Sequence, residues 1–270
     1  MSLDVPPFPT ESLASPPASP QVIFPNWPLI EGVKALSTTR QGGVSRHPWD
    51  SFNLATHVND NPYNVKKNRD LLTQAFALPN PPSWLEQIHS NEVVHLTPQN
   101  SQQAFKADAA YTTDKDIVCC VMTADCLPVL FSNKQATWVA AAHAGWKGIA
   151  NGILIKVLNI YTNEVGGALD DLQIWIGPAI SGNVYQVGQE VKYAFLQQDP
   201  VLEKAFTANE ARHYWLDSSC AAQLQLMEHG ITQQQIATED FCTYEDSERF
   251  YSYRRDGLDT GRMASLIWLS

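Results

Sequence analysis

Residues 116–131, DIVCCVMTADCLPVLF, hold two nearly continuous apolar runs separated by the short polar stretch TAD. Runs of this length, rich in β-branched residues, predict strands that are buried on both faces of a sheet. A third such run, ATWVAAA (136–142), follows, and His143 comes directly after it. We therefore expect these strands at the centre of a sheet, with Asp125, Cys126 and His143 where two of them end.

Strand patterns also occur outside this centre. VKALSTTR (33–40) and LQIWIGP (172–178) each predict one strand. SWLEQIHSNEVVHL (83–96) predicts a hairpin with His89 at its tip, and RFYSYRRDGLDTGRMASLIWL (249–269) predicts two strands joined by a polar loop.

Helical patterns alternate with these strands. Apolar residues at helical intervals predict helices within residues 59–78, 148–160, 188–198 and 217–230. Asn61 and Asp217 are expected as N-cap residues, because their short polar side chains can accept hydrogen bonds from the first turn. The alternation predicts an α/β fold, and we expect a single-domain layered sandwich with a mixed central β-sheet flanked by helices.

Composition limits the partners of the protein. The formal net charge is −10, with 17% charged and 44% hydrophobic residues, which is ordinary for a globular protein. An acidic chain lacks the basic field that displaces counterions from nucleic acids or binds anionic lipids. No run of about 18 apolar residues, the length of a membrane-spanning helix, is present. We expect no nucleic-acid partner, no membrane association and no obligate protein partner.

The first 20 residues, MSLDVPPFPTESLASPPASP, contain six prolines, no lysine or arginine, and no apolar core of a signal peptide. We expect residues 1–20 to be a disordered Pro/Ser-rich tail and residues 21–270 to form the single folded domain. Five cysteines, including the vicinal pair Cys119 and Cys120, do not resemble a secreted disulfide framework. A reducing cytoplasm is the expected location.

Cys126 and His143 are the first candidates for chemistry, because a thiolate and imidazoles form a ligand set that zinc prefers. A third ligand is needed. His89, at the tip of the predicted hairpin, is a better candidate than His95, whose apolar neighbours indicate the interior of a strand. Three protein ligands would leave one coordination position open, as in catalytic zinc sites. The spacings match no zinc-finger pattern, so the residues alone also allow a metal-free site.

Three other interpretations fit the same residues. Cys126 could be a structural thiol, and His143 could satisfy backbone groups at a strand end. The two could instead be the nucleophile and base of a cysteine hydrolase, with Asp125 orienting the imidazole. Cys119 or Cys120 could supply a fourth ligand and close a structural zinc site.

Six motifs are similar to those of one known family. They are TTRQGGVS, FNLATHVNDNPYNVKKNR, TADCLPVLF, AAAHAGWKGIANGIL, IGPAISGNVYQVGQEV and YSYRRDGLDTGR, found along one chain. Together they resemble the YfiH family, also called the laccase-domain or polyphenol oxidase family, from about residue 33 to the C-terminus. One departure is Asn59, where the family usually has glycine after His-Val, and it weakens the case for binding through His57 and Asn59.

The resemblance implies an enzyme with a metal. It implies that His89 of QIHS, Cys126 of TADC and His143 of AHAGW hold zinc, with copper as the less favoured metal. It also implies purine nucleoside phosphorolysis, with adenosine, inosine, guanosine and methylthioadenosine as candidate substrates, together with adenosine deamination. The partners would then be a nucleoside and phosphate. Some members are described as copper-dependent polyphenol oxidases or as editors of peptidoglycan precursors, and these are the alternatives.

The histidines argue against a true laccase. A multicopper oxidase needs many imidazoles, several of them in His-x-His pairs. The seven histidines of this chain include no such pair. Copper on the His-Cys-His set could support only slow oxidation, so oxidase activity is the second interpretation.

Phosphorolysis requires a group that binds phosphate. Arg40, beside a Gly-Gly turn, is the candidate, because its planar fork matches phosphate geometry, although a surface arginine before a turn is equally expected. Arg254 and Arg255 are weaker candidates, because neighbours in a predicted strand face opposite ways and at most one points at the site.

Three more residues are candidates for the reaction. Asp125 is either a proton shuttle for deamination or a supporting residue, which orients a zinc-bound histidine or accepts backbone hydrogen bonds. Asn53 could hydrogen-bond the substrate, and Trp146 could stack on the purine. An asparagine that caps its own turn and a tryptophan in the core are the commoner cases.

Overall fold

The stretch CCVMT forms strand β6 (Cys119–Thr123), and every residue of it is buried. Cys119 and Val121 face a core shared with a second sheet, whereas Cys120 and Met122 face a core that includes Leu72 of a helix. Burial on both faces is what the continuous apolar pattern predicts. The computed structural model describes residues 19–210 and 212–270. Residues 1–18 of the predicted tail lie outside the described residues.

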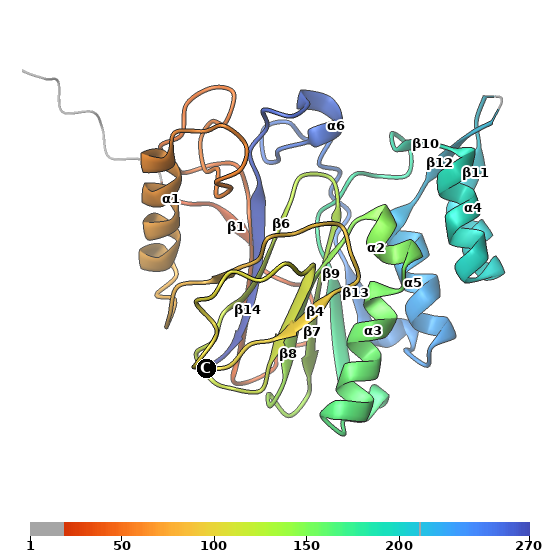
Figure 1. Cartoon of the computed structure of the whole chain (residues 1–270), viewed down its shortest axis with the longest axis horizontal. Coiled ribbons are helices and arrows are strands. Elements are labelled where there is room, and N and C mark those ends of the chain that lie inside the picture. Colours follow the sequence, from red (N-terminus) through yellow and green to blue (C-terminus); the bar gives the residue numbers. More distant parts are fainter. Residues whose placement is uncertain (1–18, 211) are drawn as a thin grey trace, which may run out of the picture.

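Two large mixed sheets form the middle of the fold (Figure 1). The five-stranded sheet has the order β1 (Val22–Ile23), β2 (Val33–Thr38), β14 (Met263–Leu269), β6, β3 (Ser83–Trp84). The six-stranded sheet has the order β13 (Ile236–Thr238), β9 (Leu172–Ile176), β7 (Leu127–Asn133), β8 (Val139–Ala144), β5 (Ala109–Thr112), β4 (Val93–His95). A small third sheet has the order β10 (Gln186–Gly188), β12 (His213–Leu216), β11 (Phe206–Ala208).

Helices cover the outer faces of the two large sheets (Figure 1). On the five-stranded side lies α1 (Pro62–Ala75), and on the six-stranded side lie α2 (Trp146–Ala150), α3 (Ile153–Asn159), α4 (Gln189–Gln198) and α5 (Ser218–Glu228). A single turn, α6 (Tyr253–Asp256), precedes β14. Apolar cores fill the space between the sheets and between each sheet and its helices. The mixed α/β class and the flanking helices are therefore confirmed.

The central strands are divided between two sheets rather than gathered in one. β6 and β7 are neighbours in sequence, yet β6 pairs with β14 and β7 pairs with β8 and β9. The polar break between them holds Asp125 with φ 86, a left-handed conformation that allows an abrupt change of direction. The chain uses this turn to cross from one sheet to the other.

The hairpin predicted at residues 83–96 is wrong. β3 pairs with β6 and β4 pairs with β5, so the segment between them also crosses from sheet to sheet. The two apolar runs found partners elsewhere, which local alternation does not reveal. The first strand predicted in residues 249–269 is wrong as well, because the chain forms α6, capped by the Ser252 side chain, before β14.

The predicted helices are present with one interruption. Asn61 and Asp217 accept hydrogen bonds from the first turns of α1 and α5, as expected for N-caps. The helix predicted within residues 148–160 begins at Trp146 and is broken at Gly152, whose φ of 75 separates α2 from α3. Across the described part of the chain, no helix has the length and apolar character needed to cross a membrane.

Candidate metal centre

Three side chains with metal-binding atoms converge at the end of the sheets where β6 stops and β7 starts. His89 lies in the crossing between β3 and β4, Cys126 directly precedes β7, and His143 lies in β8. β7 and β8 pair with Pro128 opposite His143, which places the start of one strand beside the end of the other. The ligand atoms all lie within 4.8 Å of one another, and the described residues hold no second group of this kind.

Gly145 leaves the space in which these ligands meet. A Cβ atom at this position would lie 3.2 Å from Cys126 Sγ, 3.2 Å from His89 Cδ2 and 3.7 Å from His143 Cε1. Its φ of −66 is open to any residue, so the need for glycine here is spatial rather than conformational. The HAGW motif therefore supplies a ligand and also the room beside it.

Asp108 is a buried carboxylate that positions two of the three ligands. Its Oδ1 lies 2.9 Å from His143 Nδ1 and accepts the backbone N–H of His89 at 3.0 Å. Its Oδ2 accepts the backbone N–H of Ser90 at 2.6 Å and the Ser90 hydroxyl at 2.7 Å. With Nδ1 engaged in this way, Nε2 is the ring nitrogen of His143 that remains for a metal.

The charges around the ligands shift their pKa values in opposite directions. Burial alone would raise the pKa of the Cys126 thiol, but His143, with His89, lowers it to about 6. Burial alone would lower the pKa of His143, but the Cys126 thiolate and Asp108 raise it to about 9. Hydrogen bonds from His143 and Ser90 outweigh burial and lower the pKa of Asp108 to about 2. Because the thiolate is the metal-binding form of cysteine, Cys126 is prepared to act as a ligand.

This donor set fits zinc with one open coordination position. Zinc accepts thiolate sulfur and imidazole nitrogen, and three protein ligands are typical of its catalytic sites. Cys119 and Cys120, considered as a fourth ligand, are buried in β6 and do not belong to the group. Burial raises the pKa of both thiols, so they stay protonated.

A cavity of about 460 Å³ adjoins the three ligands. Its wall includes the cationic side chains of Lys147, Arg254 and Arg262 and the aromatic side chains of Trp146, Tyr185 and Tyr253. Asp125 is the one carboxylate among the lining residues described. In a chain of net charge −10, such a collection of cations indicates a site for an anionic molecule.

Asp125 lines this cavity, but both of its carboxylate oxygens are already engaged. Oδ1 accepts the hydroxyl of Thr243 at 2.7 Å, and Oδ2 accepts the backbone N–H of Arg254 at 2.6 Å. Asp125 therefore ties the turn between β6 and β7 to the start of α6. Asp125 thus accepts a backbone hydrogen bond and positions the chain at Arg254. The residue that orients a metal ligand is Asp108. The proton-shuttle role of Asp125 stays a prediction.

Asn53 and Trp146, both predicted to contact substrate, lie in different places. Trp146 lines the cavity. Asn53 is fully buried, and its Oδ1 accepts the backbone N–H groups of Ala55 and Arg262. Asn53 is therefore not among the residues that line the cavity. Its side chain instead holds the backbone at Arg262, which does line the cavity.

Arg40, the predicted phosphate ligand, is also outside the cavity. All three of its guanidinium nitrogens are bonded, to the Asp50 carbonyl and carboxylate and to the Ser247 carbonyl. Of the two weaker candidates, Arg254 lines the cavity, whereas Arg255 donates to the carbonyls of Thr243, Tyr244 and Phe250. Only one of this pair lines the cavity, as expected, but strand alternation is not the reason, because both residues lie in the helical turn α6.

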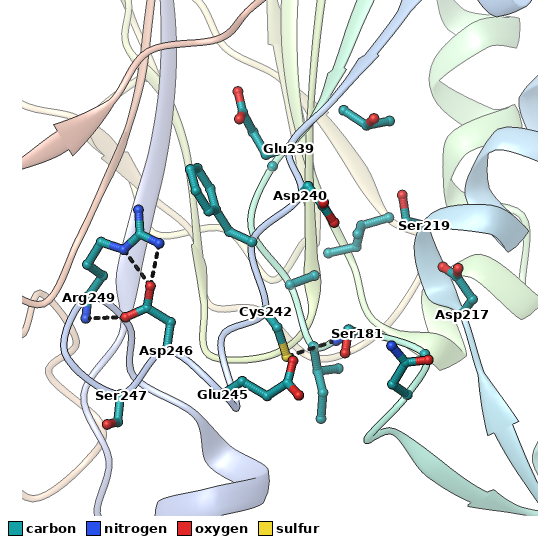
Figure 2. Close-up of a pocket in the computed structure, with 18 of the residues that line it drawn as sticks. Ser181, Asp217, Ser219, Glu239, Asp240, Cys242, Glu245, Asp246, Ser247 and Arg249 are labelled. Carbon is teal, nitrogen blue, oxygen red and sulfur yellow. Dashed lines mark hydrogen bonds and ion pairs between the residues drawn. The ribbon is translucent and has the colours of Figure 1, made fainter.

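A larger cavity, about 810 Å³, has Leu127, the first residue of β7, in its wall, and Figure 2 shows its side chains. Its wall is acidic, with the carboxylates of Asp217, Glu239, Asp240 and Glu245. Arg249 is paired there with Asp246. None of the three metal-binding residues lines it. All three line the smaller, cationic cavity, which is therefore the candidate active site.

The sequence matches the family described as multi-copper polyphenol oxidoreductase laccase over residues 34–270. The purine nucleoside phosphorylase YfiH of Escherichia coli (strain K12) is 44% identical over 249 residues, covering 92% of this chain and 99% of that protein. A purine nucleoside phosphorylase of Haemophilus influenzae is 44% identical over 250 residues, covering 92% of this chain and 99% of that protein.

Two solved structures have the same fold. The Neisseria meningitidis protein NMB0706 has a TM-score of 0.85 at 40% identity, covering 92% of this chain and 99% of that one. The Bacillus licheniformis hypothetical protein YfiH has a TM-score of 0.86 at 28% identity, covering 96% and 98%. The resemblance drawn from the motifs is confirmed: the chain belongs to the multi-copper polyphenol oxidoreductase laccase family, together with its YfiH relatives.

Proposed function

We propose that this protein is a zinc-dependent purine nucleoside phosphorylase. The observation that carries the proposal is that a His-Cys-His set and two arginines, Arg254 and Arg262, lie on one cavity. Phosphorolysis brings a phosphate dianion to C1′ of a nucleoside, and a cationic cavity suits that reactant. The names of the Escherichia coli and Haemophilus influenzae relatives support the same activity.

In the proposed reaction, the bond between C1′ of the ribose and N9 of the purine breaks, and a bond between C1′ and a phosphate oxygen forms. The electron pair of the broken bond leaves with the purine, and the proton of the HPO₄²⁻ ion ends on the purine. The products are ribose 1-phosphate and the free base, and no further reactant is required. Positioning the dianion against the cation-like sugar lowers the barrier.

The aromatic side chains of the cavity suit the purine. Trp146, Tyr185 and Tyr253 offer flat surfaces on which a base can stack. Burial raises the pKa of the Tyr185 phenol, so it stays neutral and can donate a hydrogen bond to the nucleoside. These residues would bind and orient the base while the arginines hold the phosphate.

His89, Cys126 and His143 would hold the metal. Zinc, when bound there, supplies Lewis-acid polarisation at its open position. Copper is the second metal, because imidazole and thiolate also suit it. The described residues form one such group, which supports a single metal rather than the several coppers of a true laccase.

Adenosine deamination is proposed as a second activity of the same cavity. It would replace the 6-amino group with oxygen from water and release ammonia. The preference among adenosine, inosine, guanosine and methylthioadenosine, and the cytoplasmic location, stay predictions. Asp125 is a poor shuttle while both of its oxygens accept hydrogen bonds, so a different proton acceptor or a rearrangement is required.

The test is release of free base from adenosine and inosine by zinc-loaded protein, with and without phosphate. We expect release only with phosphate, one ribose 1-phosphate per base, and loss of both products in His143→Ala. His95→Ala is the matched control, because His95 lies in β4 stacked on Tyr111 and outside the cavity. Release that is independent of phosphate, or unaffected by a chelator, would contradict the proposal and favour a hydrolase; ammonia from adenosine is measured separately.

A further inference from the structure

Arg262 enters the cavity with part of its guanidinium group unused. Its Nη1 donates to the carbonyls of Thr260 at 2.8 Å and Gly261 at 3.0 Å. Its backbone N–H donates to Asn53 Oδ1 at 3.0 Å. The side chain is therefore anchored at both ends. Across residues 19–210 and 212–270, Nε and Nη2 of Arg262 have no hydrogen-bond partner.

Arg254 is held in the same manner from a different element. Its Nη1 donates to the Gln186 carbonyl at 2.9 Å, and its backbone N–H donates to Asp125. Its guanidinium lies over the ring of Tyr185, 5.0 Å from the ring centroid. Nε and Nη2 again have no hydrogen-bond partner within the part of the chain that the structure describes.

Two other arginines, Arg40 and Arg255, show the contrasting state, in which every guanidinium nitrogen is engaged within the protein. Arg40 uses all three guanidinium nitrogens on Asp50 and Ser247. Arg255, adjacent in sequence to Arg254, also uses all three, on backbone carbonyls and on Asp256. Only the arginines of the cavity wall, among these four, leave the edge formed by Nε and Nη2 open.

That open edge is the one that binds an oxyanion. Nε–H and Nη2–H point the same way, and their spacing matches two oxygens of a phosphate or carboxylate. Anchoring through Nη1 fixes the plane of each fork before a ligand arrives, which lowers the entropy lost on binding. Asp125, the one carboxylate among the described residues that line the cavity, does not compete, because its oxygens are engaged by Thr243 and by the Arg254 backbone.

We propose that Arg262 and Arg254 form a two-arginine subsite for inorganic phosphate, with Arg262 as the inner anchor and Arg254 at the exposed rim. The assignment rests on the proposed phosphorolysis, and it replaces Arg40, the candidate from the sequence. It also predicts that carboxylates and other anions without a tetrahedral set of oxygens bind more weakly, because they can satisfy only one fork.

The test compares Arg262→Gln, Arg262→Lys and Arg254→Gln with Arg46→Gln, which removes the same charge from an exposed position away from the cavity. Three quantities are measured: the Kd of inorganic phosphate, by calorimetry on zinc-loaded protein, the KM for phosphate and the KM for inosine. Loss of the paired, charge-assisted hydrogen bonds from one arginine should raise the Kd and the KM for phosphate about 10- to 100-fold. The KM for inosine and the zinc content should stay nearly unchanged. Arg262→Lys should recover part of this loss, because it keeps the charge without the fork.

The outcomes separate the subsite from the reaction. In one outcome, the wild-type protein binds phosphate but does not catalyse phosphorolysis, and both glutamine variants lose phosphate binding. This outcome would support the subsite and overturn the proposed function. Phosphorolysis with a phosphate KM unchanged in both variants would overturn the subsite and leave the function. Equal weakening in Arg46→Gln would show general electrostatic attraction and would also overturn the subsite. Arg254→Gln keeps the test valid if Arg262→Gln does not fold, because the Arg254 side chain is exposed.

Discussion

Asp108 Oδ1 lies 2.9 Å from His143 Nδ1, and both side chains are almost completely buried. The same carboxylate accepts the backbone N–H of His89, whose φ of 57 is a left-handed conformation that needs such support. One residue that is not a ligand therefore sets the orientation of two ligands. It does so through the register of the sheet, since the backbone N–H of His143 donates to the carbonyl of Asp108 at 2.7 Å.

Asp108→Asn should weaken metal binding without removing a ligand. The amide keeps the shape but loses the charge that stabilises the Nδ1–H of His143, and such a change costs about 10- to 100-fold in metal affinity. Zinc affinity is measured by competition with a chromophoric chelator. Asp116→Asn, at an exposed position outside the metal cavity, is the control for loss of one charge. Equal affinities in both variants would mean that Asp108 only supports the fold.

Asp125→Ala and Asp125→Asn should differ in their effect on phosphate. Alanine leaves the backbone N–H of Arg254 without its acceptor, so the phosphate KM should rise, by about 10-fold for one lost charge-assisted hydrogen bond. Asparagine can accept from Arg254 with its amide oxygen and donate to the Thr243 hydroxyl, so the phosphate KM should stay near the wild-type value. Steady-state kinetics in phosphate checks this. If Asp125 instead transfers a proton, asparagine will reduce deamination as severely as alanine does.

Gly145→Ala should disturb the metal centre more than the fold. The backbone at Gly145 suits alanine, but the new Cβ would press on Cys126 Sγ and on the His89 ring at 3.2 Å. We expect zinc affinity to fall by about 10-fold, a loss typical of displaced ligands. The melting temperature of the metal-free protein should change little. Unchanged affinity would show that His89, on its crossing loop, moves aside without cost.

The features that the sequence predicts well depend on neighbouring residues. The apolar runs of β6, β7 and β8 and the caps Asn61 and Asp217 follow from periodicity and from local hydrogen bonding. Chemistry alone singles out Cys126 and His143, favours His89 over His95 as a third ligand and leaves a metal-free site possible. The motif similarity is what implies that the three residues hold zinc.

The features that the sequence does not predict depend on pairing between distant segments. β3 and β4 look like partners, but each pairs with another strand in a different sheet. Asp108 is 35 residues from His143 and meets it only because β5 and β8 pair in one register. The sequence indicates Arg40 and does not single out Arg262, and only the hydrogen bonds of each guanidinium distinguish a structural arginine from an available one.

Alkylation of Cys126 in the metal-free protein should have an unusual pH dependence. The pKa of its thiol is lowered to about 6 by His143 and His89, against an ordinary value near 8.5. The thiolate therefore exists above about pH 6 and is lost as the pH falls below it, so the rate of alkylation by iodoacetamide should rise with a midpoint near pH 6. Rates are followed by mass spectrometry of the peptide that contains Cys126.

Three comparisons give this pH profile its meaning. Zinc should block the reaction, because a liganded thiolate is protected, whereas a metal-free cysteine hydrolase would react equally with and without zinc. His143→Ala should move the midpoint upward, since it removes the main charge that stabilises the thiolate. Cys119 and Cys120, buried thiols with raised pKa values, should stay unmodified over the same range and serve as internal controls. A wild-type midpoint above pH 8 would mean that the imidazoles do not lower the pKa of the Cys126 thiol. The sulfur would then become a ligand only when a metal displaces its proton.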